Sequence, residues 1–209
     1  DGTLNVGDTF IAGTIVGILR TLPSKTASWI GFGYVEFFRN MPLLVQLFLW
    51  FFVLPELLPR AAGLWLKQIP NAPFWTAAIG IGLFMSARVA VQLGAGIASL
   101  PRGQKQAATA LGLTTGQGYR YVLLPMAFRI ILPPLTSEFL NTVKNTSVAI
   151  TIGLIELTGQ ARAMQEFSFQ VFEAFTAATV MYLAINIVVV TGMRFLERSL
   201  AIPGYITGK

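Results

Sequence analysis

Cysteine and histidine are absent from the 209-residue sequence. Their absence excludes disulfides, thiol nucleophiles, imidazole acid–base chemistry and nearly every zinc or haem site, because these need sulfur or imidazole groups. Charged residues are also few, at 11% of the chain against about 25% in an ordinary soluble domain. No basic stretch leading into an apolar run and a small-residue cleavage site is found at the start, so we expect no signal peptide.

The composition is instead that of a membrane protein. Hydrophobic residues make up 54% of the chain, and the mean hydropathy is +0.65. The net charge of +6 comes from 15 Lys and Arg against 9 Asp and Glu. In so apolar a chain this excess is typical of cytoplasmic loops and not of a nucleic-acid surface. We therefore expect an all-α polytopic membrane protein in the lipid bilayer, with no nucleic-acid partner.

Five membrane crossings are expected. A helix needs roughly 20 apolar residues to cross the hydrocarbon core, and residues 174–193 and 68–87 are uncharged over that length. Three segments are less uniform, namely one long helix over residues 27–55 that Pro42 is expected to bend, an apolar run over 130–155 that contains Glu138 and Lys144, and a short first helix over 10–19. Because no linker or low-complexity tract interrupts them, residues 1–209 are expected to form one transmembrane domain.

The positions of the charges predict the orientation, since loops rich in Lys and Arg stay in the cytoplasm. Residues 100–129 contain four basic side chains and no acidic one, so this segment is expected inside. Residues 156–173 contain three Glu and one Arg, as an outer loop should. Trp50, Trp65 and Trp75 fall near the expected outer boundary, where indole rings are favoured. We expect the N-terminus outside and the C-terminus in the cytoplasm.

Residues 101–125 predict two short helices on the inner face. Pro101 suits the first turn of a helix, and Gly112 suits the left-handed residue that ends one. The Thr114 to Gln117 spacing is that of a capping box, which begins a second helix. Small residues along this segment would let another protein approach the backbone closely. The alternative is an inert amphipathic loop that rests on anionic lipid.

The spacing within residues 106–125 resembles a known signature. Permease subunits of ABC importers carry Glu-Ala-Ala, then Gly after three residues, then Ile-x-Leu-Pro after nine more. Here Gln106, Ala107 and Ala108 precede Gly112, and Pro125 closes the motif at the same spacing. Residues 35–46, 133–147 and the Pro203-Gly204 pair also resemble the polar amino-acid branch of that family. Residues 37–59 together with 100–113 look most like permeases of glutamate/aspartate importers.

The resemblance, which covers roughly residues 15–209, implies a fold, partners and a location. The fold would be that of a type I (MetI-like) importer permease with cytoplasmic coupling helices. The partners would be two cytoplasmic ABC ATPases, a second permease subunit that is identical or related, and an extracytoplasmic amino-acid-binding protein. The chain would lie in the bacterial plasma membrane. Contact with the ATPase would fall to the following residues: Gln106, Ala107, Ala108, Leu111, Gly112 and Leu113.

Catalysis and cofactor binding are not expected on this chain. The sequence has no Gly-x-x-x-x-Gly-Lys-Ser/Thr segment, which a P-loop needs to hold nucleotide phosphates. ATP and Mg²⁺ would be bound by the partner ATPase, and no metal site is expected here.

Polar residues inside the apolar crossings are the candidates for the substrate path, because intramembrane charge is costly unless it faces a cavity or a partner. Arg88 could hold the carboxylate of an acidic amino acid in two bonds, or it could pair with Glu138 or with a backbone carbonyl. Gln46, Asn141 and Asn145 could line the same path or join helices. Glu36 and Arg39 are expected to form a structural ion pair.

The sequence departs from the family pattern at three positions. Gln106 replaces the usual Glu of the signature, which removes any charged contact made there. Val91 and Gly94 stand where this branch commonly has an acidic residue and an Arg. If that charged pair closes the inner gate in relatives, this chain would gate differently.

Two other functions compete with the permease interpretation. An ion-coupled secondary amino-acid transporter would need no ATPase, but the paired repeats typical of such carriers are not found in the sequence. An intramembrane hydrolase could use Lys144 and Ser147, which share a helix face, although no oxyanion donors are recognisable around them. A membrane scaffold without a transport path is less favoured, because several crossings contain polar residues.

Overall fold

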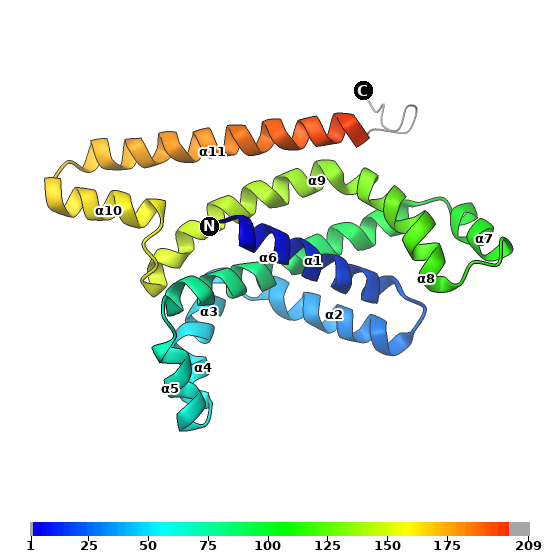
Figure 1. The fold of residues 1–209 in the computed structure, drawn as a ribbon, viewed down its shortest axis with the longest axis horizontal. Coiled ribbons are helices and arrows are strands. Elements are labelled where there is room, and N and C mark those ends of the chain that lie inside the picture. The colour runs from blue at the N-terminus through cyan, green and yellow to red at the C-terminus, as the bar shows by residue number, and fades with distance from the viewer. Residues whose placement is uncertain (1, 201–209) are drawn as a thin grey trace.

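The computed structural model describes residues 2–200, and every regular element in that range is a helix. Figure 1 shows them as an elongated bundle with short helices at both ends. The elements in chain order are α1 (Gly2–Thr21), α2 (Lys25–Asn40), α3 (Leu43–Phe48), the π-helical turn η1 (Leu49–Val53), α4 (Leu54–Leu57), α5 (Arg60–Gln68), α6 (Ala72–Ser99), α7 (Arg102–Ala110), α8 (Thr115–Gly118), the π-helical turn η2 (Tyr119–Leu123), α9 (Leu124–Asn145), the 3-10 helix η3 (Thr146–Ile152), α10 (Leu157–Ser168) and α11 (Val171–Leu200).

Helix α6 is the centre of the bundle. It contributes to three buried apolar clusters, which it forms with α9 and η2, with α3 and η3, and with α2. Small residues, such as Gly13 on α1, let neighbouring helices approach α6, as in other membrane helix bundles. The contact with α1 is so close that a Cβ on Gly13 would lie 2.6 Å from Cβ of Val89. This packing places the middle of α6, with Arg88, against α9.

Three helical stretches are long and apolar enough to cross a membrane: Ala72–Ser99, Thr115–Ile152 and Val171–Ser199. They correspond to three of the expected crossings. Helix α1 also forms, but its apolar part, Thr9–Thr21, is shorter than these. Helix α11 packs on α9 and α10, and only 11% of its most apolar window is buried within the chain. The rest of its surface is therefore available to lipid or to another subunit.

The expected long helix over residues 27–55 is wrong. Helix α2 ends at Asn40, and the chain turns by 101° before it continues from Leu43 to Leu57. Pro42 explains the break, because its ring and missing N–H interrupt the helical hydrogen bonds. Together the two parts are long and apolar enough for one broken span, which would be a fourth crossing.

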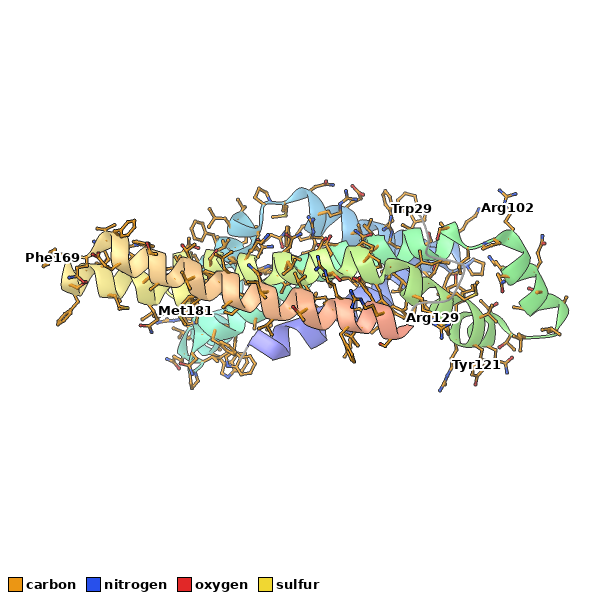
Figure 2. All side chains as sticks on the ribbon, turned by 90° about the horizontal axis from the view of Figure 1, so that it is seen from above. Trp29, Arg102, Tyr121, Arg129, Phe169 and Met181 are labelled. Atoms are coloured by element: carbon orange, nitrogen blue, oxygen red, sulfur yellow. The ribbon has the colours of Figure 1, made fainter. Side chains whose placement is uncertain are left out.

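The two ends of the bundle differ in composition. Figure 1 shows α7 and α8 at one end, together with the ends of α1, α6 and α11, whereas α4, α5 and α10 lie toward the other. In Figure 2, Arg102, Tyr121 and Arg129 gather at the first end and Phe169 marks the opposite one. The segments that carry the expected inner basic residues thus share one end, as the charge pattern predicts.

Candidate functional site

An ion pair between α6 and α9 forms the polar centre of the bundle. Nε of Arg88 donates to Oε2 of Glu138 at 2.7 Å, across 50 positions of sequence. The Glu138 side chain is 9% exposed and the Arg88 side chain 39%. Of the three arrangements that the sequence left open for Arg88, pairing with Glu138 is therefore present.

The pair leaves part of the guanidinium free to bind. An arginine side chain has five N–H donors, and Glu138 engages the one on Nε. The two terminal nitrogens form a planar fork that matches a carboxylate. Among residues 2–200, no protein acceptor is bonded to this fork, and the side chain remains partly exposed. The arrangement can hold a second carboxylate while Glu138 fixes the orientation of the arginine.

Gln46 does not line a path, contrary to the expectation. Its side chain is completely buried, and Nε2 donates to the backbone oxygens of Phe38 at 2.9 Å and Met41 at 3.1 Å. Phe38 lies in the last turn of α2 and Met41 is its C-cap residue, where helical partners are missing because the chain breaks at Pro42. Gln46 therefore stabilises the helix break.

The two asparagines lie on α9 beyond Glu138. Asn141 is half-buried and one turn from Glu138, which places both on the same side of the helix. Asn145 is also half-buried, and its Nδ2 lies 3.3 Å from the sulfur of Met85 on α6. Asn145 thus joins two helices, whereas contact of either asparagine with a substrate stays a prediction.

Helix α7 begins and ends as the sequence predicts. Pro101 stands immediately before its first residue, and Gly112 follows its end with φ of +74°. The amide of Gly112 donates to the Thr109 carbonyl at 3.0 Å, and that of Leu113 to the Ala108 carbonyl at 3.1 Å. This is the Schellman pattern, in which a left-handed residue satisfies the last carbonyls of a helix. Only glycine adopts such a conformation without steric cost.

The predicted capping box forms at the start of α8. The Gln117 amide donates to Oγ1 of Thr114 at 3.3 Å, and the Thr114 amide donates to Oε1 of Gln117 at 2.9 Å. The hydroxyl of Tyr119 then donates to the Thr21 carbonyl at 2.5 Å, which ties the segment to the end of α1. No pattern in the sequence predicts this last contact, because its partners are 98 positions apart.

Most of the predicted ATPase-contact residues lie on the surface. Gln106, Ala107, Leu111 and Gly112 are exposed, and Leu111 reaches 79%. Leu113 is half-buried. Ala108 differs from the expectation of an exposed contact residue, because it is only 6% exposed. It packs on Gly118, where an added Cβ would lie 3.8 Å from the Cβ of Ala108. Ala108 therefore holds α7 against α8 and does not face a partner.

Neither the predicted Glu36–Arg39 ion pair nor the Lys144–Ser147 pair of the alternative hydrolase forms. Among residues 2–200, no ion pair joins Glu36 to Arg39, and Oε2 of Glu36 instead accepts from Nδ2 of Asn40 at 2.7 Å. Asn40 lies four positions on, where a helical neighbour faces Glu36 directly. Ser147 donates its hydroxyl proton to the Lys144 backbone oxygen at 2.7 Å, so its Oγ is not activated by the lysine amine. This geometry argues against the hydrolase.

The described part of the chain contains no group of three or more His, Cys, Asp or Glu placed to hold a metal ion.

Comparisons with known proteins bear on this arrangement. The family profile described as "Binding-protein-dependent transport system inner membrane component" matches residues 10–202. The chain is 49% identical to the glutamate/aspartate import permease protein GltJ of Escherichia coli K12, over 96% of this chain and 82% of that one. It is 34% identical to a probable glutamine ABC transporter permease protein, GlnM of Bacillus subtilis, over 91% of this chain and 84% of the other.

Solved structures have the same fold. A crystal structure of an amino acid ABC transporter with histidines matches with a TM-score of 0.78 and 28% identity, over 95% of this chain and 88% of that one. An inward-facing methionine ABC transporter, MetNI, matches with a TM-score of 0.75 at 17% identity, over 96% and 91% of the two chains. The second likeness concerns the fold alone.

Proposed function

The chain belongs to the family of binding-protein-dependent transport system inner membrane components, and from that premise we propose that it is the permease subunit of an ABC importer for glutamate or aspartate. The observation that supports this substrate most strongly is the 49% identity to a glutamate/aspartate permease along almost the whole chain. The substrate is thus a polar amino acid with a second carboxylate.

Arg88 is the residue of this chain that recognises the acidic substrate. Its terminal nitrogens bind a substrate carboxylate, and Glu138 holds the guanidinium by Nε from the side. Glu138 therefore acts as a positioning residue. Asn141, one turn further along α9, extends the same polar surface.

Energy enters through residues 101–125, which we call the coupling segment. Its exposed Leu111 is a large apolar side chain that contact with the ATPase would remove from water. Two cytoplasmic ATPase subunits bind ATP and Mg²⁺, a second permease subunit completes the path, and an extracytoplasmic binding protein delivers the amino acid. In this proposal the chain lies in the bacterial plasma membrane with its N-terminus outside and its C-terminus in the cytoplasm.

Transport in vesicles tests the function. The chain, copurified with its own subunits and reconstituted with the binding protein, should import glutamate or aspartate only with ATP on the side of the coupling segment. An ion gradient without ATP should drive no uptake. Uptake that follows the ion gradient alone would replace this proposal with the secondary transporter.

The substrate role of Arg88 is tested separately with Arg88→Gln. An amide in place of the guanidinium removes the fork, so uptake of glutamate should fall at least about 10-fold, the loss expected for one charge-assisted contact. ATPase copurification should not change, because residue 88 lies away from the coupling segment. Unchanged uptake would show that Arg88 serves structure alone.

A further inference from the structure

A cavity of about 300 Å³ lies where the coupling segment meets the bundle. It is far larger than the roughly 30 Å³ that a water molecule occupies. The end of α6 and the turn η2 give it an apolar wall, formed by Ile97, Leu100 and Leu123. The first turn of α7 adds two basic side chains, those of Arg102 and Lys105. The cavity therefore combines an apolar wall with two cations.

The two basic side chains at the cavity have no counter-ion within the chain. Arg102 and Lys105 are exposed, and among residues 2–200 neither forms an ion pair with a carboxylate. They are three positions apart on α7, so they lie on the same face of the helix. None of the described residues that line the cavity is acidic, and residues 100–129 contain no Asp or Glu. Two like charges that the protein leaves uncompensated favour an anion beside them.

The cavity lies on the side of α7 that faces the bundle and not on the side offered to the ATPase. Ala108, three positions after Lys105, is buried against Gly118 and marks the inward face of α7. Ala107, two positions after Lys105, is exposed, and so is Leu111 one turn further on. Two positions correspond to about half a turn of an α-helix, so this pair lies on the opposite face. An ATPase that contacts Ala107 and Leu111 would therefore not fill the cavity.

The surroundings of the cavity place it at the boundary of the membrane. Helix α7 begins directly after Ala72–Ser99, a stretch long and apolar enough to cross the bilayer. Trp29, near the start of α2, is 76% exposed, and exposed indole rings favour the membrane–water interface. Figure 2 shows Trp29 and Arg102 along one edge of the molecule. That this boundary is the cytoplasmic one rests on the orientation proposed above, and anionic lipids of that leaflet attract basic residues next to a membrane helix.

We propose that this cavity binds an anionic phospholipid, such as phosphatidylglycerol. Its phosphate lies beside Arg102 and Lys105, which donate charge-assisted hydrogen bonds to the phosphate oxygens. One acyl chain covers the apolar wall formed by Ile97, Leu100 and Leu123. A free phosphate would leave that wall in contact with water, and a zwitterionic lipid would bring a further positive charge to the two cations. An anionic lipid satisfies both the wall and the charges.

The lipid that stays on the purified complex tests the proposal. The chain, purified with its own subunits, is equilibrated in detergent with equal amounts of phosphatidylglycerol, phosphatidylethanolamine and phosphatidylcholine, and retained lipid is counted by native mass spectrometry. Phosphatidylglycerol should be retained preferentially, because the other two headgroups carry a cation. Arg102→Gln and Lys105→Gln should each lower its retention about five-fold, the factor that one basic residue contributes to the binding of anionic lipid.

Arg120→Gln is the matched control. It removes the same charge from the coupling segment, but Arg120 does not line the cavity and lies over the ring of Tyr121, 5.8 Å from its centroid. Figure 2 shows Tyr121 along the edge of the molecule opposite to Arg102. This variant should change retained phosphatidylglycerol by less than about two-fold, because its charge acts only at a distance. Lys105→Arg keeps the charge and should retain lipid as the unmodified chain does.

Three results would overturn the proposal. An equal loss with Arg120→Gln would show a diffuse attraction between a basic segment and anionic lipid, without a site. Equal retention of the three lipids by the unmodified complex would contradict the selection by charge. Displacement of phosphatidylglycerol by an excess of glycerol 3-phosphate would assign the cavity to a soluble anion.

The outcome is separate from that of the proposed function, because retained lipid is measured without transport. A complex that does not retain phosphatidylglycerol can still import glutamate with ATP, and this would reject the lipid site alone. A complex that retains the lipid but shows no ATP-driven uptake would reject the function alone. The melting temperature of each variant is measured first, so that retained lipid is compared only among folded proteins.

Discussion

The helix-ending bonds of the coupling segment and the Arg88–Glu138 pair differ in how far along the chain they reach. In the coupling segment the helix-ending bonds join residues within five positions, and the segment is largely exposed. The ion pair joins residues 50 positions apart and buries the carboxylate. The helix ends of the coupling segment are therefore specified by local backbone preferences, whereas the ion pair depends on how α6 and α9 pack.

The largest effect is expected at the ion pair. Arg88→Leu leaves the Glu138 carboxylate at 9% exposure without its partner. Breaking a buried pair lowers the free energy of unfolding by about 3 to 5 kcal/mol. Because Arg88 is partly exposed, we expect a loss of about 3 kcal/mol. Adding Glu138→Leu removes the unpaired charge and should restore most of the stability, measured by denaturant unfolding in detergent.

The double variant also separates structure from transport. If Arg88 binds the substrate carboxylate, Arg88→Leu with Glu138→Leu should be stable yet defective in glutamate uptake. Recovery of uptake together with stability would mean that the pair has a structural role only. A double variant no more stable than Arg88→Leu would contradict the buried-charge argument itself.

A smaller effect is expected at Gly112, where the coupling segment needs a left-handed residue. Gly112→Val forces a β-branched side chain to φ of +74°, at a cost of about 1 to 3 kcal/mol. The short loop can relax in place of the whole bundle, so the melting temperature should change little. ATPase copurification and ATP-driven uptake should both decrease. Gly116→Ala is the control, since its Cβ would meet no atom within 4 Å. Equal losses of copurified ATPase and of uptake in both variants would contradict the explanation.

A still smaller effect is expected at the capping box. Thr114→Ala removes the acceptor for the Gln117 amide and should destabilise the start of α8 by about 1 kcal/mol. Hydrogen exchange at residues 115–118 should become about five-fold faster, the factor that corresponds to about 1 kcal/mol. Thr114→Ser keeps the hydroxyl and should exchange as the unmodified chain does. Faster exchange spread over α6 and α9 would show that the cap supports more than its own turn.

These differences explain which features were predictable from the sequence. The positions of Pro101, Gly112 and Thr114 predicted the helix ends, because a cap depends on residues a few positions apart. Glu138 was one of three partners left open for Arg88, because the sequence alone does not determine which faces of two distant helices meet. Gln46 was misassigned for a related reason. Its acceptors are carbonyls freed by the break at Pro42, and the break was predicted as a bend within one helix.

Local spacing is not sufficient by itself, and the end of α2 offers the most sensitive test. Glu36 had two helical neighbours within reach, and it bonds Asn40 at 2.7 Å instead of Arg39. Asn40→Ala should therefore lower the free energy of unfolding by about 0.5 kcal/mol, the lower end for an exposed hydrogen bond, whereas Arg39→Gln should change it by less. Both are measured by denaturant unfolding at low salt, where any surface ion pair is strongest. Arg39→Gln could instead cause the larger loss of unfolding free energy, and that loss could disappear at high salt. This result would mean that Glu36 pairs with Arg39 in solution and that opposite charge outweighs the four-residue spacing.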